Sequence, residues 1–276
     1  MTDHFAAFSF VDRITAFEPG RRARGTFAVP ADVSSFPACL VAEATGQLAA
    51  WVAMAHVDFR TRPVAALAGD TRFVGAVAPG DTLALAVEIE SCDDEAVAYA
   101  GWAEVDGVRV LELFDCCGAM LPVDDFDSPD ALRKRFALLR GAGAAPGRFR
   151  GVAPPHLVGA NGVRGESARA SLQVPASAPF FADHFPRRPV FPATLLLDAQ
   201  IRLAMKLAGD VAGVPLAPMR MTRVKVRSFT PPGSTLELAA ELAPPTAGGV
   251  AIALTASAEG KTVATARLEM SPRETR

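Results

Sequence analysis

The sequence predicts an α+β protein in which two antiparallel β-sheets each wrap around a long buried central helix, so that one chain forms a pseudo-dimer. Three observations support this fold class: an internal repeat, one long apolar segment in each half, and alternating apolar runs that meet at Gly-centred turns. Residues 71–90 resemble residues 224–243, and both segments carry Pro-Gly-(Asp/Ser)-Thr-Leu before an alternating run. Pro79 and Pro232 of this motif are 153 residues apart. Self-similarity of this kind indicates a repeated structural unit.

The two long apolar segments are predicted to be helices. A Phe-Pro-Ala triplet occurs at residues 36–38 and again at 191–193, which is an offset of 155, and each triplet opens a continuous apolar run. The runs, residues 39–55 and 194–209, are too long for strands, rich in Leu and Ala, and begin just after a proline. Each property favours a helix. Because the first run is apolar nearly all round, we expect it to be buried on every side.

The remaining alternating runs are predicted to be antiparallel strands. Val-Asp-Gly at residues 105–107 corresponds to Ala-Glu-Gly at 258–260, again 153 residues later. Each triplet lies between two alternating runs, which is typical of a β-hairpin.

A connection between the halves is predicted to contain a short helix. Ser128 is its expected N-cap, Pro129 its first residue and Gly141 its C′ residue. The Gly/Ala/Pro-rich stretch that ends at Gly147 has the composition of a linker. We therefore expect three parts: an N-terminal unit over 1–124, a linker with its helix over 125–152, and a C-terminal unit over 153–276.

Composition and charge exclude several classes of function. Of the 276 residues, 50% are hydrophobic and 21% are charged, and the net charge is −2. This balance argues against a nucleic-acid-binding protein, which needs a basic face. We find no membrane span and no signal peptide. The four cysteines show no C-x-x-C spacing, so we expect no metal site, no cofactor and a cytoplasmic location.

The second half carries a specific motif: residues 184–198 read HFPRRPVFPATLLLD. This motif resembles that of the FabA/FabZ-type 3-hydroxyacyl-(acyl carrier protein) dehydratases, whose pattern is H-F-P-x-x-P-x-x-P-G-x-L-x-x-(D/E). Ala193 stands where the family has Gly. The resemblance extends over most of the chain outside the linker and implies a double hotdog fold. The matching positions are His184, Phe185, Pro186, Pro189, Pro192, Leu195 and Asp198.

The resemblance implies dehydration of a 3-hydroxyacyl thioester to the trans-2-enoyl thioester, in fatty-acid or polyketide-like biosynthesis. This reaction needs a base at C2, an acid for the leaving hydroxyl and a donor for the thioester oxygen. His184 suits the base, because a histidine titrates near neutrality. A carboxyl in an apolar tunnel can hold the proton to be donated. The backbone amide near Ala193 can polarise the carbonyl, and prolines such as Pro192 stiffen the loop.

The two halves have lost complementary parts of the implied site. In the family the histidine comes from one hotdog and the carboxylate from the other. The first half is ten residues shorter just before its helix and has no counterpart of His184. Its helix nevertheless keeps Glu43 at the position of Asp198, with Gln47 four residues later on the same face.

We therefore expect one complete site, built from His184 and Glu43 with Gln47 in support. Asp198 faces a missing histidine, so we expect it to pair with Arg202 and to be non-catalytic. The order of the parts, carboxylate first and histidine second, is the reverse of that in polyketide-synthase dehydratase domains.

Arg187 and Arg188 are expected at the mouth of the site. There they could bind the phosphopantetheine arm of an acidic acyl carrier protein; the alternative is a solvated turn. A second basic group is expected to form a solvated helix face, with carrier docking as the alternative: Arg133, Lys134, Arg135 and Arg140. Three histidines outside the motif are expected to be structural or solvent-facing: His4, His56 and His156.

Two other functions are compatible with the fold: a hotdog thioesterase and a non-catalytic acyl-binding or scaffold module. The intact His-Phe-Pro loop argues against the thioesterase, and the complementary losses argue against simple erosion of function. The expected partner is an acyl carrier protein, or an acyl-CoA. The chain is expected to be a monomer or a homodimer.

Overall fold

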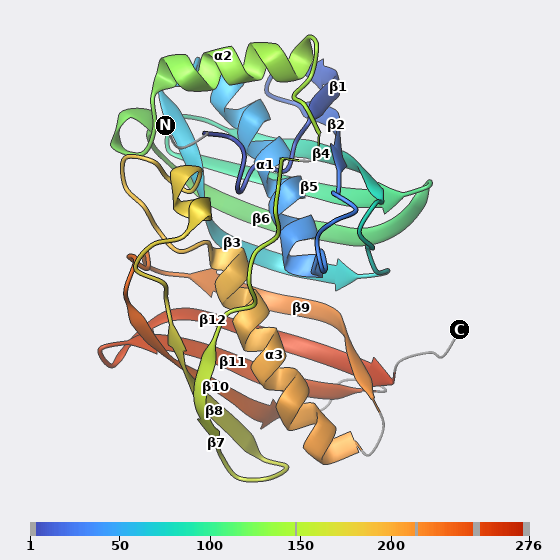
Figure 1. Ribbon diagram of the computed structural model, residues 1–276, viewed down its shortest axis with the longest axis vertical. Helices are drawn as coiled ribbons and strands as arrows, with labels where there is room; N and C mark the ends of the chain where they lie inside the picture. Colours follow the sequence, from blue (N-terminus) through green and yellow to red (C-terminus); the bar gives the residue numbers. More distant parts are fainter. Residues whose placement is uncertain (1–3, 147, 213–214, 245–248, 273–276) are drawn as a thin grey trace.

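The computed structural model describes residues 4–146, 148–212, 215–244 and 249–272 and confirms the predicted fold class (Figure 1). Apart from the short η2, the two halves contain the same elements in the same order: two strands, a long helix and four strands. The N-terminal half comprises β1 (Arg13–Glu18), β2 (Arg22–Ala28), α1 (Ala38–His56), β3 (Thr61–Phe73), β4 (Thr82–Cys92), β5 (Ala96–Val105) and β6 (Val108–Pro122). The C-terminal half comprises β7 (Leu157–Asn161), β8 (Ser167–Gln173), η2 (Pro179–Ala182), α3 (Ala193–Ala212), β9 (Leu216–Val226), β10 (Thr235–Ala243), β11 (Val250–Ala258) and β12 (Lys261–Pro272). Between the halves lie η1 (Val123–Asp125) and α2 (Pro129–Arg140).

The strands form one antiparallel sheet of twelve, in the order β1-β2-β4-β5-β6-β3-β9-β12-β11-β10-β8-β7. The two expected sheets are therefore joined edge to edge where β3 pairs with β9. A bidentate ion pair reinforces this seam, because Arg220 on β9 donates from Nε and Nη2 to the Asp70 carboxylate on β3, at 2.7 and 3.0 Å. The seam leaves no open strand edge between the halves.

The two central helices begin directly after the prolines that predicted them. The carbonyl of Pro37 accepts the Leu40 N–H at 2.8 Å, and that of Pro192 accepts the Leu195 N–H at 3.1 Å. Figure 1 shows α1 lying against the N-terminal half of the sheet and α3 against the C-terminal half. Among the described residues, α1 is the one helix long and apolar enough to cross a membrane, and 61% of its most apolar window is buried in this fold.

The predicted hairpins are confirmed. Asp106 and Gly107, between β5 and β6, both have positive φ, at 51° and 77°. Glu259 and Gly260, between β11 and β12, match them at 49° and 75°. Two consecutive positive φ values define the type I′ turn that suits the twist of a two-residue hairpin.

The connecting helix α2 has the predicted N-cap, since Ser128 Oγ accepts the Ala131 N–H at 3.4 Å. Its C-terminus differs from the prediction. Gly141 is the C-cap with φ −100°, and the left-handed residue is Gly143 at +83°. Two predicted features lie outside the described residues: Gly147 at the end of the linker stretch, and residues 1–3, on which the absence of a signal peptide depends. The three-part division of the chain stays a prediction.

Candidate active site

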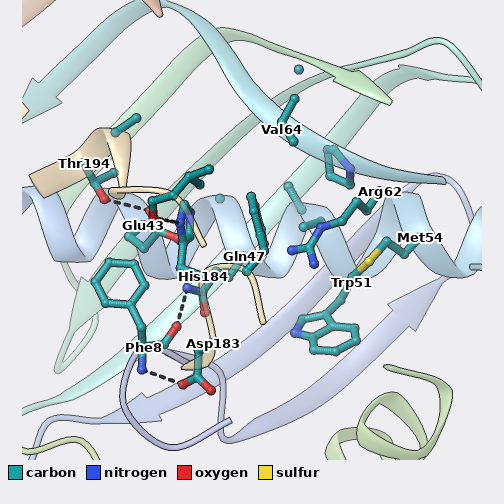
Figure 2. A pocket seen from close by; sticks show the side chains of 18 of the residues that line it. Phe8, Glu43, Gln47, Trp51, Met54, Arg62, Val64, Asp183, His184 and Thr194 are labelled. Carbon is teal, nitrogen blue, oxygen red and sulfur yellow. Dashed lines mark hydrogen bonds between the residues drawn. The ribbon is translucent and has the colours of Figure 1, made fainter. Parts of the chain in front are cut away.

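A cavity of about 210 Å³ lies between the two halves. Its walls come from α1, the N-terminal segment before β1, strand β3, the loop after η2 and the first turn of α3. Most of the lining is apolar. Figure 2 shows the polar exceptions, which gather near Glu43, Gln47 and His184.

His184 lies in the loop between η2 and α3, and backbone hydrogen bonds shape this loop around it. The His184 N–H donates to the Phe180 carbonyl at 2.9 Å, and the Val190 N–H donates to the His184 carbonyl at 3.2 Å. The side-chain Nδ1 is 3.0 Å from the Val190 carbonyl oxygen. Because a carbonyl only accepts, Nδ1 carries the hydrogen, and Nε2 keeps a lone pair.

The surroundings of His184 favour its neutral form. Burial lowers the pKa of His184, and the nearby positive charge of Arg62 acts in the same direction. The negative charge of Glu43 and the bond to Val190 oppose this without reversing it. A neutral imidazole with Nε2 free is the form that a general base requires.

Glu43 is held by residues from both halves. Its Oε1 accepts from Gln47 Nε2 at 2.9 Å, as the i,i+4 spacing on α1 predicted. Its Oε2 accepts from the hydroxyl of Thr194 at 2.8 Å, and Thr194 belongs to the first turn of α3. Sequence reasoning missed Thr194, although it follows Ala193 directly in the motif.

The N-terminal segment is tied to both parts of the site. Gln47 donates from Nε2 to the Phe8 carbonyl at 3.0 Å and accepts from the Phe10 N–H at 2.8 Å. Asp183, next to His184, accepts the N–H groups of Phe5 and Phe8 at 2.5 and 2.7 Å. The ring of Phe8 meets the imidazole edge to face, with the centroids 5.7 Å apart. Sequence reasoning missed Asp183 too, because the motif begins one residue later.

Ala193 lies at the start of α3 and lines the cavity. Its backbone N–H makes no hydrogen bond to the described part of the chain, so it can donate to a substrate carbonyl. The Pro192 carbonyl before it accepts the N–H groups of Leu195 and Leu196, both at 3.1 Å. Ala193 does not have a positive φ, so alanine in place of the family's glycine causes no backbone strain.

In the C-terminal half, the carboxylate equivalent to Glu43 is held in an ion pair. Arg202 Nε donates to Asp198 Oδ2 at 2.6 Å, as expected from their spacing. The offset of 155 makes Cys39 on α1 the counterpart of Thr194, just as Glu43 is the counterpart of Asp198. Cys39 therefore occupies, near Asp198, the position that Thr194 occupies near Glu43. Burial, and next the Asp198 charge, raise the pKa of the Cys39 thiol well above its ordinary value. None of these three residues lines the cavity.

The expected basic surfaces are found in part. Arg187 Nη1 donates to the Asp124 carbonyl and Oδ1, at 2.9 and 3.0 Å. The Arg188 guanidinium lies 4.8 Å from the ring centre of Phe229, which itself lines the cavity. Both arginines are exposed.

The expectation of a fully solvated helix face on α2 is wrong for Arg135, which is 9% exposed and lines the cavity. The reason is its spacing, because Arg135 falls on the buried face that Leu132 and Leu139 also form. The other members of the basic group are exposed, as expected: Arg133, Lys134 and Arg140.

None of the remaining histidines lines the cavity. His56 and His156 are exposed. His4 is partly buried, with Nε2 3.3 Å from Asp127 Oδ2. Within the described residues, no group of three or more His, Cys, Asp or Glu side chains is arranged to hold a metal ion.

Fold and cavity together define the class of this protein: a double hotdog with a cavity between its halves that His184 and Glu43 both line. A family model for the FabA-like domain matches residues 4–113, and a model for ApeI dehydratase matches residues 161–267. The 3-hydroxyacyl-[acyl-carrier-protein] dehydratase FabZ of Bacillus subtilis is 36% identical over 122 residues, covering 40% of this chain and 86% of that protein. The chain therefore belongs to the FabZ family of 3-hydroxyacyl-[acyl-carrier-protein] dehydratases.

Other relatives match over a shorter segment. FabZ of Rhodospirillum rubrum is 44% identical over 52 residues, and this match covers 19% of the chain and 32% of that protein. The chain thus matches only about a third of the length of this relative.

Solved structures share the fold at low identity. The dehydratase domain of PpsC from Mycobacterium tuberculosis, in complex with C12:1-CoA, is 14% identical with a TM-score of 0.56, covering 96% of this chain and 99% of that one. The 12:0-ACP thioesterase from Umbellularia californica is 12% identical with the same TM-score of 0.56, covering 91% and 94%. The shared fold does not separate dehydratase from thioesterase, so the argument for function rests on the site.

Proposed function

We propose that this chain dehydrates 3-hydroxyacyl thioesters at one composite active site. The observation that carries the proposal is the pairing of His184 from the C-terminal half with Glu43 from the N-terminal half in one cavity. Gln47 and Thr194 fix the carboxyl group from two sides. The corresponding Asp198 is paired with Arg202 and lies outside the cavity.

His184 begins the reaction as a general base. Its free Nε2 takes the proton from C2 of the substrate, and the electron pair of that C–H bond forms the C2=C3 double bond. The backbone N–H of Ala193, at the positive end of the α3 dipole, stabilises the charge that develops on the thioester oxygen. The bond from Nδ1 to the Val190 carbonyl holds the imidazole in the required tautomer.

Glu43, in its protonated form, completes the reaction as the general acid. The C3–O bond breaks, the hydroxyl leaves with the Glu43 proton as water, and the trans-2-enoyl thioester remains. Transfer of the proton from His184 to Glu43 restores both groups. The Thr194 hydroxyl can donate to the carboxylate or accept from the carboxylic acid, so it stabilises Glu43 in both states.

The substrate carrier is proposed to be an acyl carrier protein, with acyl-CoA as the other possibility. Arg187 and Arg188 are both exposed, and the Arg188 guanidinium lies against Phe229 of the cavity wall, which supports a role for this loop in binding a phosphopantetheine arm. Because one chain supplies both halves of the site, a monomer suffices for activity. We propose a cytoplasmic location.

Hydration of crotonyl thioesters, which is the reverse of the proposed reaction, tests the proposal. The wild-type protein should add water to give the 3-hydroxybutyryl thioester without releasing free thiol, and His184→Ala should lower kcat/KM by a factor of about 10²–10⁴. Thiol release without hydration would instead identify a thioesterase. Absence of both reactions, on carrier-protein and CoA thioesters alike, would indicate the binding or scaffold module.

A further inference from the structure

Arg62 is a buried cation in the wall of the cavity. It lies on β3, and its guanidinium points toward the part of α1 that carries Gln47, Trp51 and Met54 (Figure 2). Its side chain is 12% exposed, and its guanidinium lies over the Phe185 ring at 3.9 Å from the ring centre. Phe185 follows His184 directly, so Arg62 is close to the catalytic loop without belonging to it.

The guanidinium of Arg62 has hydrogen-bond donors that the described residues do not satisfy. Nε and Nη1 are buried and make no hydrogen bond to any described group. The nearest carboxylate oxygen, Asp127 Oδ2, is 3.7 Å from Nη1, which is too far for a hydrogen bond. The other oxygen of Asp127 accepts the Ser128 N–H at 2.7 Å. Asp127 therefore compensates the charge of Arg62 but leaves its donors open.

Such an arrangement is uncommon in a purely structural arginine. Buried charged groups are normally hydrogen-bonded, because burying unsatisfied donors costs free energy. Burial lowers the pKa of Arg62 to about 10, so the guanidinium remains protonated at neutral pH. A planar cation with free donors beside an acyl-thioester site is suited to a carbonyl or carboxylate oxygen.

We propose that Arg62 binds an oxygen acceptor of the substrate that lies away from the reacting carbons. The acceptor is a carbonyl or carboxylate oxygen, and this inference rests on the proposed function of the site. Gln47 and Trp51 follow Glu43 by four and eight residues, so Trp51 is about 12 Å further along the α1 axis. Arg62 faces this part of the cavity. Two sources fit the chemistry: the outer amide of the pantetheine arm, which N-acetylcysteamine lacks, or an oxygenated far end of the acyl chain.

Three 2-enoyl thioester substrates separate the two possible sources of the acceptor oxygen. Crotonyl-N-acetylcysteamine carries only a short arm, crotonyl-pantetheine adds the remainder of the arm, and an ω-carboxy-2-octenoyl-N-acetylcysteamine adds a distal carboxylate. Each is assayed for hydration with the wild-type protein, Arg62→Gln and Arg62→Lys. Arg60→Gln is the matched control, because Arg60 is an exposed neighbour that bonds Asp94 instead.

Wild-type protein should prefer one of the longer substrates over crotonyl-N-acetylcysteamine. Arg62→Gln should lower kcat/KM on that substrate by about 10- to 100-fold, mainly through KM, since a charge-assisted hydrogen bond is lost. It should stay within threefold of wild type on crotonyl-N-acetylcysteamine, and Arg62→Lys should restore part of the loss. A loss on the pantetheine substrate assigns the acceptor to the arm, and a loss on the ω-carboxy substrate assigns it to the acyl chain.

The proposal is overturned if the wild-type protein shows no preference for either longer substrate, or if Arg62→Gln lowers all three rates equally, as a structural role would. Failure of the wild type to hydrate any substrate would count against the proposed function instead. In that case calorimetric titration with the unreactive thioether analogues decides the role of Arg62. Weaker binding of a longer analogue to Arg62→Gln supports it, and equal binding overturns it.

Discussion

Replacing Asp183 with alanine should disable the site without touching a reacting group. Asp183 accepts the N–H groups of Phe5 and Phe8, at 2.5 and 2.7 Å. These bonds anchor the N-terminal segment to the loop that carries His184. The same segment bonds Gln47, which in turn holds Glu43. Asp183→Ala therefore removes a link between the two halves of the active site.

The expected magnitude follows from the two bonds. A hydrogen bond to a charged group contributes about 1.5–3 kcal/mol, and Asp183 is only partly buried, so we expect about 2–4 kcal/mol for the pair. If half of this stabilisation persists in the transition state, kcat/KM falls about 5- to 30-fold. Asp183→Asn keeps one acceptor and should lose less.

Hydration kinetics and amide hydrogen exchange check this prediction together. Exchange at Phe5 and Phe8 should accelerate in Asp183→Ala, while exchange in the sheet stays unchanged. Asp94→Ala is the control, because it removes an exposed carboxylate that pairs with Arg60 away from the site. Activity within twofold of wild type in Asp183→Ala, or unchanged exchange at both amides, would refute the anchoring role.

Three further predictions concern pH, the seam and the cavity. Dehydration requires the base form of His184, whose pKa is lowered, so the rate of dehydration of a 3-hydroxybutyryl thioester should rise with pH through a midpoint below the ordinary value of about 6.5; a midpoint above 7 would contradict this. Asp70→Ala should lower the unfolding free energy by about 1–3 kcal/mol. This is less than the loss expected for a fully buried ion pair, because the Arg220 side chain is 43% exposed and solvent screens the interaction. Burial opposes ionisation of Asp70, but Arg220 and Arg72 lower its pKa overall, so this stabilisation is present above about pH 4 and is lost as the pH falls further. Denaturant melts that give the same difference in unfolding free energy between wild type and Asp70→Ala at pH 7 and at pH 3 would contradict it. Gly46→Leu should impair long acyl chains more than short ones, since even a Cβ at Gly46 would lie 3.3 Å from the Tyr99 hydroxyl; an equal effect on crotonyl and dodecenoyl thioesters would show that chains do not pass there.

The sequence was sufficient to predict the fold class and to predict that Glu43 and His184 lie in one cavity. The offset of 155 aligned Glu43 with Asp198, and the missing loop in the first half left His184 without a copy. The i,i+4 rule then placed Gln47 beside Glu43, and the hydrogen bond of 2.9 Å agrees with it. Each inference depended on local spacing along one helix or on a long specific motif. The catalytic roles themselves stay predictions until the variants are measured.

The features that were missed depend on contacts between distant segments. Thr194 reaches Glu43 across 151 residues, and Asp183 reaches Phe5 across 178. No local pattern indicates which chain segments meet across a pseudo-twofold axis. The pairing of β3 with β9 was missed for the same reason. Arg135 was misjudged because a run of basic residues suggested solvent, although its spacing from Leu132 and Leu139 places it on the buried face.

The central claim, one composite site per chain, is tested most directly by comparing Glu43→Gln with Asp198→Asn. Both changes remove one carboxylate from equivalent positions of the two central helices, and both keep the shape of the side chain. Hydration of crotonyl thioesters should fall about 10²-fold or more in Glu43→Gln, because in this reverse direction the Glu43 carboxylate is the general base that takes a proton from water, and it should stay within threefold in Asp198→Asn. The opposite order, or equal losses in both variants, would contradict a single site built from Glu43 and His184.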